Sequence, residues 1–119
     1  MAKNSSLSAV VYTCDVLVVG AGPAGIAAAL TLHAAGKHVI VIDKAKFPRD
    51  KCCGDGLTTG ALRLLDELGF DPNTVSSWRQ CDEVWLRSPR GRETMLPLPR
   101  NSGQFAAIAP RLKLDNALV

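Results

Sequence analysis

The stretch DVLVVGAGPAGIAAAL, residues 15 to 30, decides the fold, because a valine-rich apolar run leads directly into a Gly-x-Gly-x-x-Gly turn. The run DVLVV, residues 15 to 19, is typical of a strand that is buried on both faces in a parallel sheet. Pro23 suits the first turn of a following helix, since the N–H that proline lacks would have no partner there. Alanine and leucine dominate residues 26 to 35, and Gly36 ends this predicted helix.

A second strand is predicted at HVIVID, residues 38 to 43, so residues 15 to 43 form a β-α-β unit with a right-handed crossover. Residues 16 to 32 carry no charge and reach the lower length limit of a membrane span. Two glycines and a proline near the middle argue against one continuous lipid-facing helix. The fold class is therefore α/β, a Rossmann-like nucleotide-binding start.

The remaining sequence predicts an amphipathic helix, a β-hairpin, a strand and a last helix. The apolar face of the first helix is expected at Leu57, Ala61, Leu64, Leu65 and Leu68. Gly69 ends it. Residues 83 to 88 and 93 to 98 flank the turn PRGR and predict the hairpin. Residues 105 to 109 are a strand candidate, and a helix begins at Pro110.

The domain organisation follows from this order of elements. Residues 1 to 13 are polar and rich in serine, which predicts a loose leader. A parallel sheet opened by one β-α-β unit needs further strands to bury both of its faces. This sequence turns into a hairpin instead. We therefore expect residues 14 to 119 to be the N-terminal portion of a longer nucleotide-binding domain, incomplete at its C-terminus.

Composition excludes several other classes of protein. Hydrophobic residues make up 47% and charged residues 21%, as in ordinary globular proteins, and the net charge is only +3. No run of Lys or Arg occurs, so nucleic acid is not expected as a partner. The four cysteines, at positions 14, 52, 53 and 81, form no Cys-x-x-Cys pair, so no metal site is expected. A cytoplasmic, reducing location fits this usage.

The glycine turn predicts dinucleotide binding. Gly20 permits the tight turn, and Gly22 has no side chain to obstruct a pyrophosphate that approaches the backbone. Gly25 allows close packing of the helix on the strand, and the helix N-terminus offers free N–H groups to phosphates. Asp43 ends the second strand, 23 residues after Gly20, where it would accept hydrogen bonds from ribose hydroxyls. These residues do not distinguish FAD from NAD.

The segment FPRDKCCGDGLTTGALRLL, residues 47 to 65, makes that distinction. It resembles the geranylgeranyl reductase family of FAD-dependent oxidoreductases, within the superfamily of aromatic hydroxylases and flavin-dependent halogenases. The family's FPR-x-K-x-CG-x-GL pattern is matched by Phe47, Pro48, Arg49, Lys51, Cys53, Gly54, Gly56 and Leu57. Arg111 and Asp115 match a later Arg-x-x-x-Asp element. Cys52 stands where the family commonly has proline, and Thr59-Gly60 replace a common Pro-Arg.

The resemblance implies FAD as the cofactor and assigns residues to its two ends. Gly25 and Asp43 would contact the ADP half, and Arg111 would also contact the cofactor. Cys53, Gly54 and Gly56 would lie along the flavin. Of the adjacent cysteines, the family pattern assigns the flavin-facing position to Cys53 and no contact to Cys52. A strained disulfide between the two is the alternative, disfavoured by disulfide geometry and a reducing location.

The resemblance also implies an activity. The complete enzyme would pass hydride from reduced FAD to the double bond of a prenyl or isoprenoid-lipid substrate, with NAD(P)H or another reductant as electron donor and peripheral contact with a membrane. No residue of this sequence is identified as catalytic. A flavin-dependent monooxygenase or halogenase on the same scaffold is one alternative, because the substrate regions of these enzymes lie further along the chain. A truncated, non-catalytic remnant is the other.

Overall fold

The computed structural model describes residues 10–99, 103 and 105–119. Its N-terminal part is the predicted β-α-β unit, consisting of β1 (Val16–Val19), α1 (Pro23–Ala34) and β2 (Val39–Ile42). The two strands pair in parallel, with Val16 opposite Val39 and Val19 opposite Ile42. The α/β fold class is confirmed, and the strand and helix bounds fall close to those predicted.

The apolar faces of the two strands stay partly exposed, as expected of a β-α-β unit that lacks the further strands of a buried parallel sheet. Helix α1 packs against β1 and β2. On these strands Leu17 is 52% exposed, Val19 77% and Ile42 47%. Among the described residues, α1 packs on one face of this two-stranded sheet, whereas a buried parallel sheet has helices on both faces.

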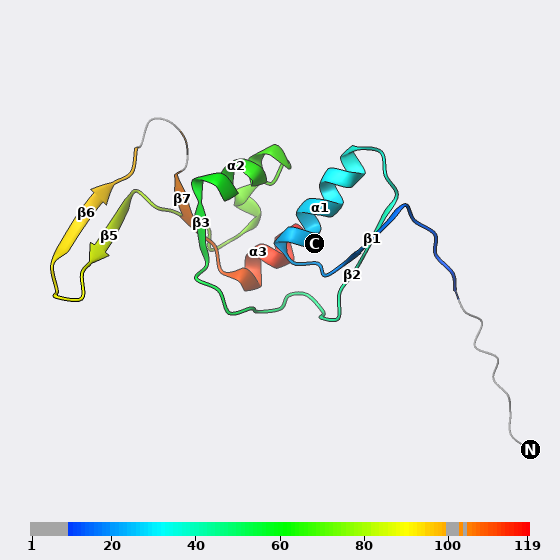
Figure 1. Cartoon of the computed structure of the whole chain (residues 1–119), viewed down its shortest axis with the longest axis horizontal. Helices are drawn as coiled ribbons and strands as arrows, with labels where there is room; N and C mark the ends of the chain where they lie inside the picture. The colour runs from blue at the N-terminus through cyan, green and yellow to red at the C-terminus, as the bar shows by residue number, and fades with distance from the viewer. Residues whose placement is uncertain (1–9, 100–102, 104) are drawn as a thin grey trace, which may run out of the picture.

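The second part of the molecule is built on a three-stranded antiparallel sheet in the order β3-β7-β4. Strands β3 (Gly56–Thr58), β4 (Arg79–Gln80) and β7 (Ala106–Ile108) are all short. Of the three strands, only β7 was predicted from the sequence. Helix α2 (Thr59–Glu67), the 3-10 turn η1 (Pro72–Thr74) and helix α3 (Arg111–Leu118) accompany this sheet (Figure 1).

Helix α2 begins after Leu57, which was predicted on its apolar face but lies in β3, and the leucine it buries is a different one from those predicted. Thr58 caps it by accepting a hydrogen bond from the Ala61 amide at 3.4 Å, and Gly69 follows it with a φ of +73°. Leu62 is the buried leucine, while Leu64, expected on the apolar face, is 54% exposed. The core beside it consists of Val75, Ala109 and Leu114, with partly buried Leu57, Phe70, Trp78, Ala117 and Leu118 around them.

The predicted hairpin is present as β5 (Glu83–Arg87) and β6 (Glu93–Pro97). It extends away from the helices, as Figure 1 shows at the opposite end from β1 and β2. Trp85 pairs with Met95 across the strands, and both are exposed, at 62% and 43%. Every residue of the two strands is exposed, so the hairpin adds nothing to the core of this chain. Within the described ranges, no helix combines the length and apolarity needed to cross a membrane.

We expect residues 1 to 119, expressed alone, to lack a sharp cooperative melt. The exposed faces of β1 and β2 and the small core leave little free energy of unfolding, because small chains have little stability to spare. Circular dichroism during a thermal ramp checks this. A steep, reversible transition with the enthalpy of a complete domain of this length would contradict it.

Candidate cofactor site

The glycine turn between β1 and α1 has a backbone that only glycine fits at two positions. Gly20 has a φ of +110°, in the left-handed region that side chains rarely adopt. A Cβ added to Gly25 would lie 1.8 Å from the Gly20 carbonyl oxygen and 3.3 Å from Val18 Cγ1. The start of α1 is therefore pressed onto the end of β1, as the sequence pattern predicts.

Two backbone hydrogen bonds fix this turn. The Gly20 amide donates to the carbonyl of Ile42 at 2.7 Å, which ties the turn to the end of β2. The Ile26 amide donates to the Gly22 carbonyl at 3.0 Å and closes the first turn of α1. No side chain caps the N-terminus of this helix, where Pro23 occupies the first turn. The positive end of the helix dipole is thus presented at Gly22.

Asp43 lies at the same turn and is held by two backbone amides. Its Oδ2 accepts a hydrogen bond from the Ala21 amide and its Oδ1 one from the Ala45 amide, both at 2.7 Å. The Ala45 and Ala21 amides, in that order, lower the pKa of the Asp43 carboxyl. An open groove of about 480 Å³ adjoins it, lined by Val19, Gly20, Ile42, Asp43 and Lys44.

The CCGDG segment places an exposed thiol beside a guanidinium. The backbone amide of Asp55 and, next, the side chain of Arg111 lower the pKa of the Cys53 thiol. A Cβ added to Gly54 would meet nothing within 4 Å, so the space beside the Gly54 backbone is open. Cys52 and Cys53 are both free and exposed, and no disulfide joins them.

Asp55 connects this segment to α3. It has a φ of +54°, its carbonyl accepts a hydrogen bond from the Ala109 amide at 2.9 Å, and its Oδ1 accepts one from the Arg111 amide at 3.1 Å. Its two bonds to neighbouring segments hold the backbone in this rare conformation. Arg111 is thereby fixed next to Cys53.

Arg111 and Arg49 meet at Asp115, whose side chain is fully buried. Arg111 donates from Nε to Asp115 Oδ1 at 2.7 Å and from Nη2 to Oδ2 at 2.8 Å. This pairing raises the pKa of the Arg111 guanidinium. Arg49 Nη1 lies 2.9 Å from Asp115 Oδ2 as an ion pair, without hydrogen-bond geometry. The Arg49 guanidinium also stacks over the Phe47 ring, 5.0 Å from its centroid.

The two parts of the site converge on Gly22. A Cβ added there would lie 3.4 Å from Arg49 Nη2 and 4.0 Å from Arg111 Nη2. Of the residues expected to hold a cofactor, the structure places Gly20, Gly22, Gly25 and Asp43 at one turn. Arg111 bridges from that turn to Cys53, with Gly54 and Gly56 following in the chain.

Sequence reasoning did not assign site roles to Arg49, Asp55 and Asp115. Arg49 and Asp115 are within the matched family patterns, and the spacing of Arg111 and Asp115 already suggests a helical ion pair. Asp55 gave no such signal, because its contacts depend on a left-handed backbone conformation and a partner 56 residues away.

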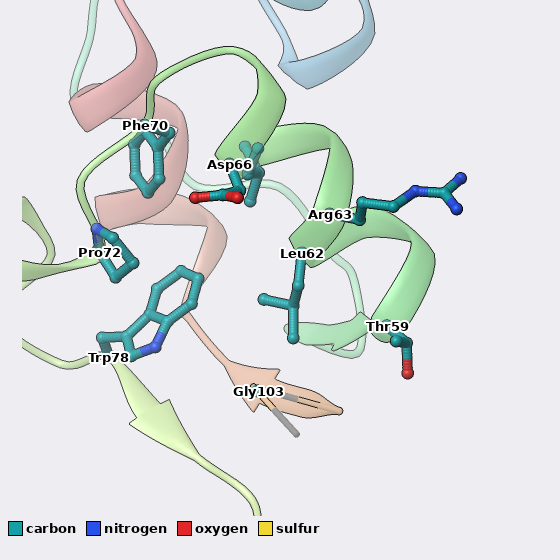
Figure 2. A pocket seen from close by; sticks show the side chains of 9 residues that line it. Thr59, Leu62, Arg63, Asp66, Phe70, Pro72, Trp78 and Gly103 are labelled. Carbon is teal, nitrogen blue, oxygen red and sulfur yellow. The ribbon is translucent and has the colours of Figure 1, made fainter. Parts of the chain in front are cut away.

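A separate pocket of about 500 Å³ lies beside α2 (Figure 2). Figure 2 shows Leu62, Phe70 and Trp78 around it, with Arg63 directed outward. The rings of Phe70 and Trp78 are 6.2 Å apart between centroids. None of its lining residues belongs to the glycine turn, the CCGDG segment or α3. The pocket is therefore distinct from the cofactor site.

Residues 13–119 match the family model of the FAD-binding domain, over the glycine turn, the CCGDG segment and α3 alike. The chain belongs to this FAD-binding domain family. The prediction of FAD from residues 47 to 65 is thereby confirmed at the level of the family.

Relatives of this FAD-binding domain include two reductases. A menaquinone reductase of Mycobacterium tuberculosis strain H37Rv is 61% identical over 111 residues, which are 89% of this chain and 26% of the relative. Digeranylgeranylglycerophospholipid reductase 1 of Methanothermobacter thermautotrophicus is 39% identical over 83 residues, 69% of this chain and 20% of the relative.

A solved structure is also similar to this chain. The geranylgeranyl bacteriochlorophyll reductase-like protein of Thermoplasma acidophilum superposes with a TM-score of 0.70 at 26% identity, covering 88% of this chain and 26% of that one. The predicted resemblance to the geranylgeranyl reductase family is confirmed. The chain spans about a quarter of the length of these proteins.

Arg111 should control the acidity of Cys53. We expect iodoacetamide to alkylate Cys53 of the FAD-free protein at a lower pH than an ordinary thiol, because the thiolate is the nucleophile. Arg111→Met should move the midpoint of the pH–rate profile upward, since it removes a positive charge beside the thiolate. Peptide-resolved mass spectrometry in a Cys52→Ser background measures this.

The matched control is Arg63→Met, which removes an exposed guanidinium of α2. This variant should leave the Cys53 midpoint unchanged. An Arg111→Met profile that coincides with the unmodified one would show that Arg111 does not act on the thiol.

Proposed function

We propose that the chain is the FAD-binding part of a reductase that saturates a prenyl-chain double bond. The complete enzyme transfers hydride from reduced FAD to this bond, and NAD(P)H or another reductant restores the flavin. The observation that carries the proposal is the convergence of the glycine turn, Asp43 and the Arg111–Cys53 pair in a chain of the FAD-binding domain family.

The residues fit the ADP half of FAD at the glycine turn. The N-terminus of α1 and the bare Cα of Gly22 would receive the pyrophosphate, with the guanidinium of Arg111 next to it. Each oxygen of Asp43 already accepts one amide hydrogen bond and keeps a lone pair for a ribose hydroxyl. The groove beside Asp43 would take the adenosine.

The flavin end would lie along Cys53, Gly54 and Gly56. Bound FAD supplies the hydride chemistry, and the protein supplies orientation and electrostatics. The open space beside Gly54 allows the backbone to approach a planar ring. Arg111 and the N-terminus of α2, capped at Thr58, would supply positive potential to a ring bound there, which favours an anionic reduced ring.

The substrate class is inferred from the relatives. A menaquinone reductase and a digeranylgeranylglycerophospholipid reductase, by their names, both act on molecules that carry isoprenoid chains. We propose a prenyl or isoprenoid-lipid substrate for this enzyme too. A lipid of this kind resides in a membrane, so a cytoplasmic enzyme that contacts the membrane surface is the matching location.

We expect the complete protein to be yellow when purified and to release FAD on denaturation. Gly22→Leu should largely abolish the bound flavin, because its side chain would occupy the approach of the pyrophosphate. Absorbance at the flavin bands and chromatography of the released nucleotide measure both. Ala34→Leu, at an exposed position at the opposite end of α1, is the control and should keep its FAD.

A colourless protein that binds NAD tightly and ignores FAD would contradict the cofactor. The reaction is tested separately by reducing the enzyme without oxygen and adding a prenyl lipid. Reoxidation of the flavin with saturation of the prenyl chain supports the reductase. Reoxidation only with oxygen and an aromatic substrate would indicate a monooxygenase or halogenase instead.

Cys53 rather than Cys52 should influence the flavin. We expect Cys53→Ala to shift the absorption spectrum of the flavin, its reduction potential or the turnover rate. The reason is that the thiol lies beside Arg111, where the flavin ring is proposed to bind. Cys52→Pro, which restores the residue common in the family, should be nearly silent. The opposite ranking of the two variants would show that the flavin contacts are assigned to the wrong cysteine.

A further inference from the structure

Asp115 binds two arginines that come from distant parts of the chain. Arg49 lies in the loop after β2, and Arg111 is the first residue of α3. The Asp115 side chain is 0% exposed, and those of Arg49 and Arg111 are 19% and 15% exposed. A carboxylate buried to this degree is stable only when it is paired, so it fixes both guanidiniums in place.

The two guanidiniums lie directly at the glycine turn. The nearest atoms to a Cβ on Gly22 are Arg49 Nη2 at 3.4 Å and Arg111 Nη2 at 4.0 Å. Both guanidiniums therefore border the small space beside the Gly22 backbone. This is the space that a pyrophosphate needs when it approaches a glycine turn of this type.

Asp115 alone serves both guanidiniums of this cluster. The next carboxylates are Asp43, which acts on Arg49 through its charge, and Asp55, which accepts from the Arg111 amide. In addition, Arg49 Nη1 is buried and makes no hydrogen bond, although it contacts Asp115. A buried N–H group that is ion-paired but makes no hydrogen bond costs free energy, and an anion with free oxygens beside Gly22 would accept hydrogen bonds from the guanidinium N–H groups.

We propose that Asp115 is a positioning residue for the pyrophosphate of FAD, because it holds Arg49 and Arg111 at Gly22 so that both face the phosphates. The proposal rests on the proposed function and adds Arg49 to the groups that bind the cofactor. Asp115 itself touches no phosphate and acts through the two arginines.

Positioning and simple electrostatics predict opposite effects for Asp115→Asn. Removal of a negative charge near the phosphates would by itself strengthen their binding. Loss of positioning weakens it, since the amide offers one acceptor oxygen to two guanidiniums that now repel each other. The sign of the change in affinity therefore separates the two explanations.

The test uses the complete protein stripped of FAD, with ADP and adenosine as competitors for FAD rebinding. Asp115→Asn should weaken the binding of FAD and of ADP by about tenfold or more. The affinity for adenosine, which has no phosphates, should stay the same. Arg49→Lys should give the same pattern more weakly, because it keeps the charge but loses the planar fork. Glu67→Gln, an exposed neutralisation on α2, is the matched control and should change nothing.

Each other outcome has a defined meaning. Equal losses for ADP and adenosine in Asp115→Asn would assign Asp115 a merely structural role and overturn the proposal, as would unchanged or tighter FAD binding. If Asp115→Asn does not fold, Arg49→Lys replaces it in the test. Weaker ADP binding with unchanged adenosine binding then supports the proposal, and equal losses for both overturn it. Failure of the unmodified protein to bind FAD at all would instead refute the proposed function.

Discussion

The close approach of α1 to β1 at Gly25 is the constraint on which the site depends. Because no side chain separates Gly25 from the Gly20 carbonyl, the helix begins directly above the end of the strand. Its first N–H groups, which have no side-chain cap, then lie next to Gly22. Asp43, at the end of β2, reaches the same turn through the Ala21 amide. A larger residue at Gly25 would separate these groups.

Polar contacts then join the remainder of the chain to this turn. Asp55 attaches the CCGDG segment to the start of α3, and Asp115 attaches α3 to Arg49 in the loop that follows β2. Both acids form their contacts across long stretches of sequence, and both position Arg111. The second part of the molecule is thus connected to the loop after β2 through Asp115 and Arg49, and α3 also contacts α1. Arg111 in addition faces Cys53.

The sequence predicted those elements whose patterns are local. The β-α-β unit, the hairpin and the stop at Gly69 follow from period, glycine and proline within a few residues. Strands β3 and β4 escaped prediction because they exist only by pairing with β7. Leu62 rather than Leu64 faces inward because tertiary packing, and not the period alone, selects the face of a short helix. The site residues divide in the same way. The glycines and Asp43 form a local sequence motif and could be predicted, whereas Arg49, Asp55 and Asp115 act through contacts between distant segments.

An experimental structure of the complete protein with FAD tests this account most directly. The account predicts the pyrophosphate beside the Gly22 backbone, within hydrogen-bond distance of the first amides of α1 and of the guanidiniums of Arg49 and Arg111. It also predicts the isoalloxazine ring on the side of Cys53. A pyrophosphate bound elsewhere, or one with Arg49 and Arg111 still turned only toward Asp115, would contradict it.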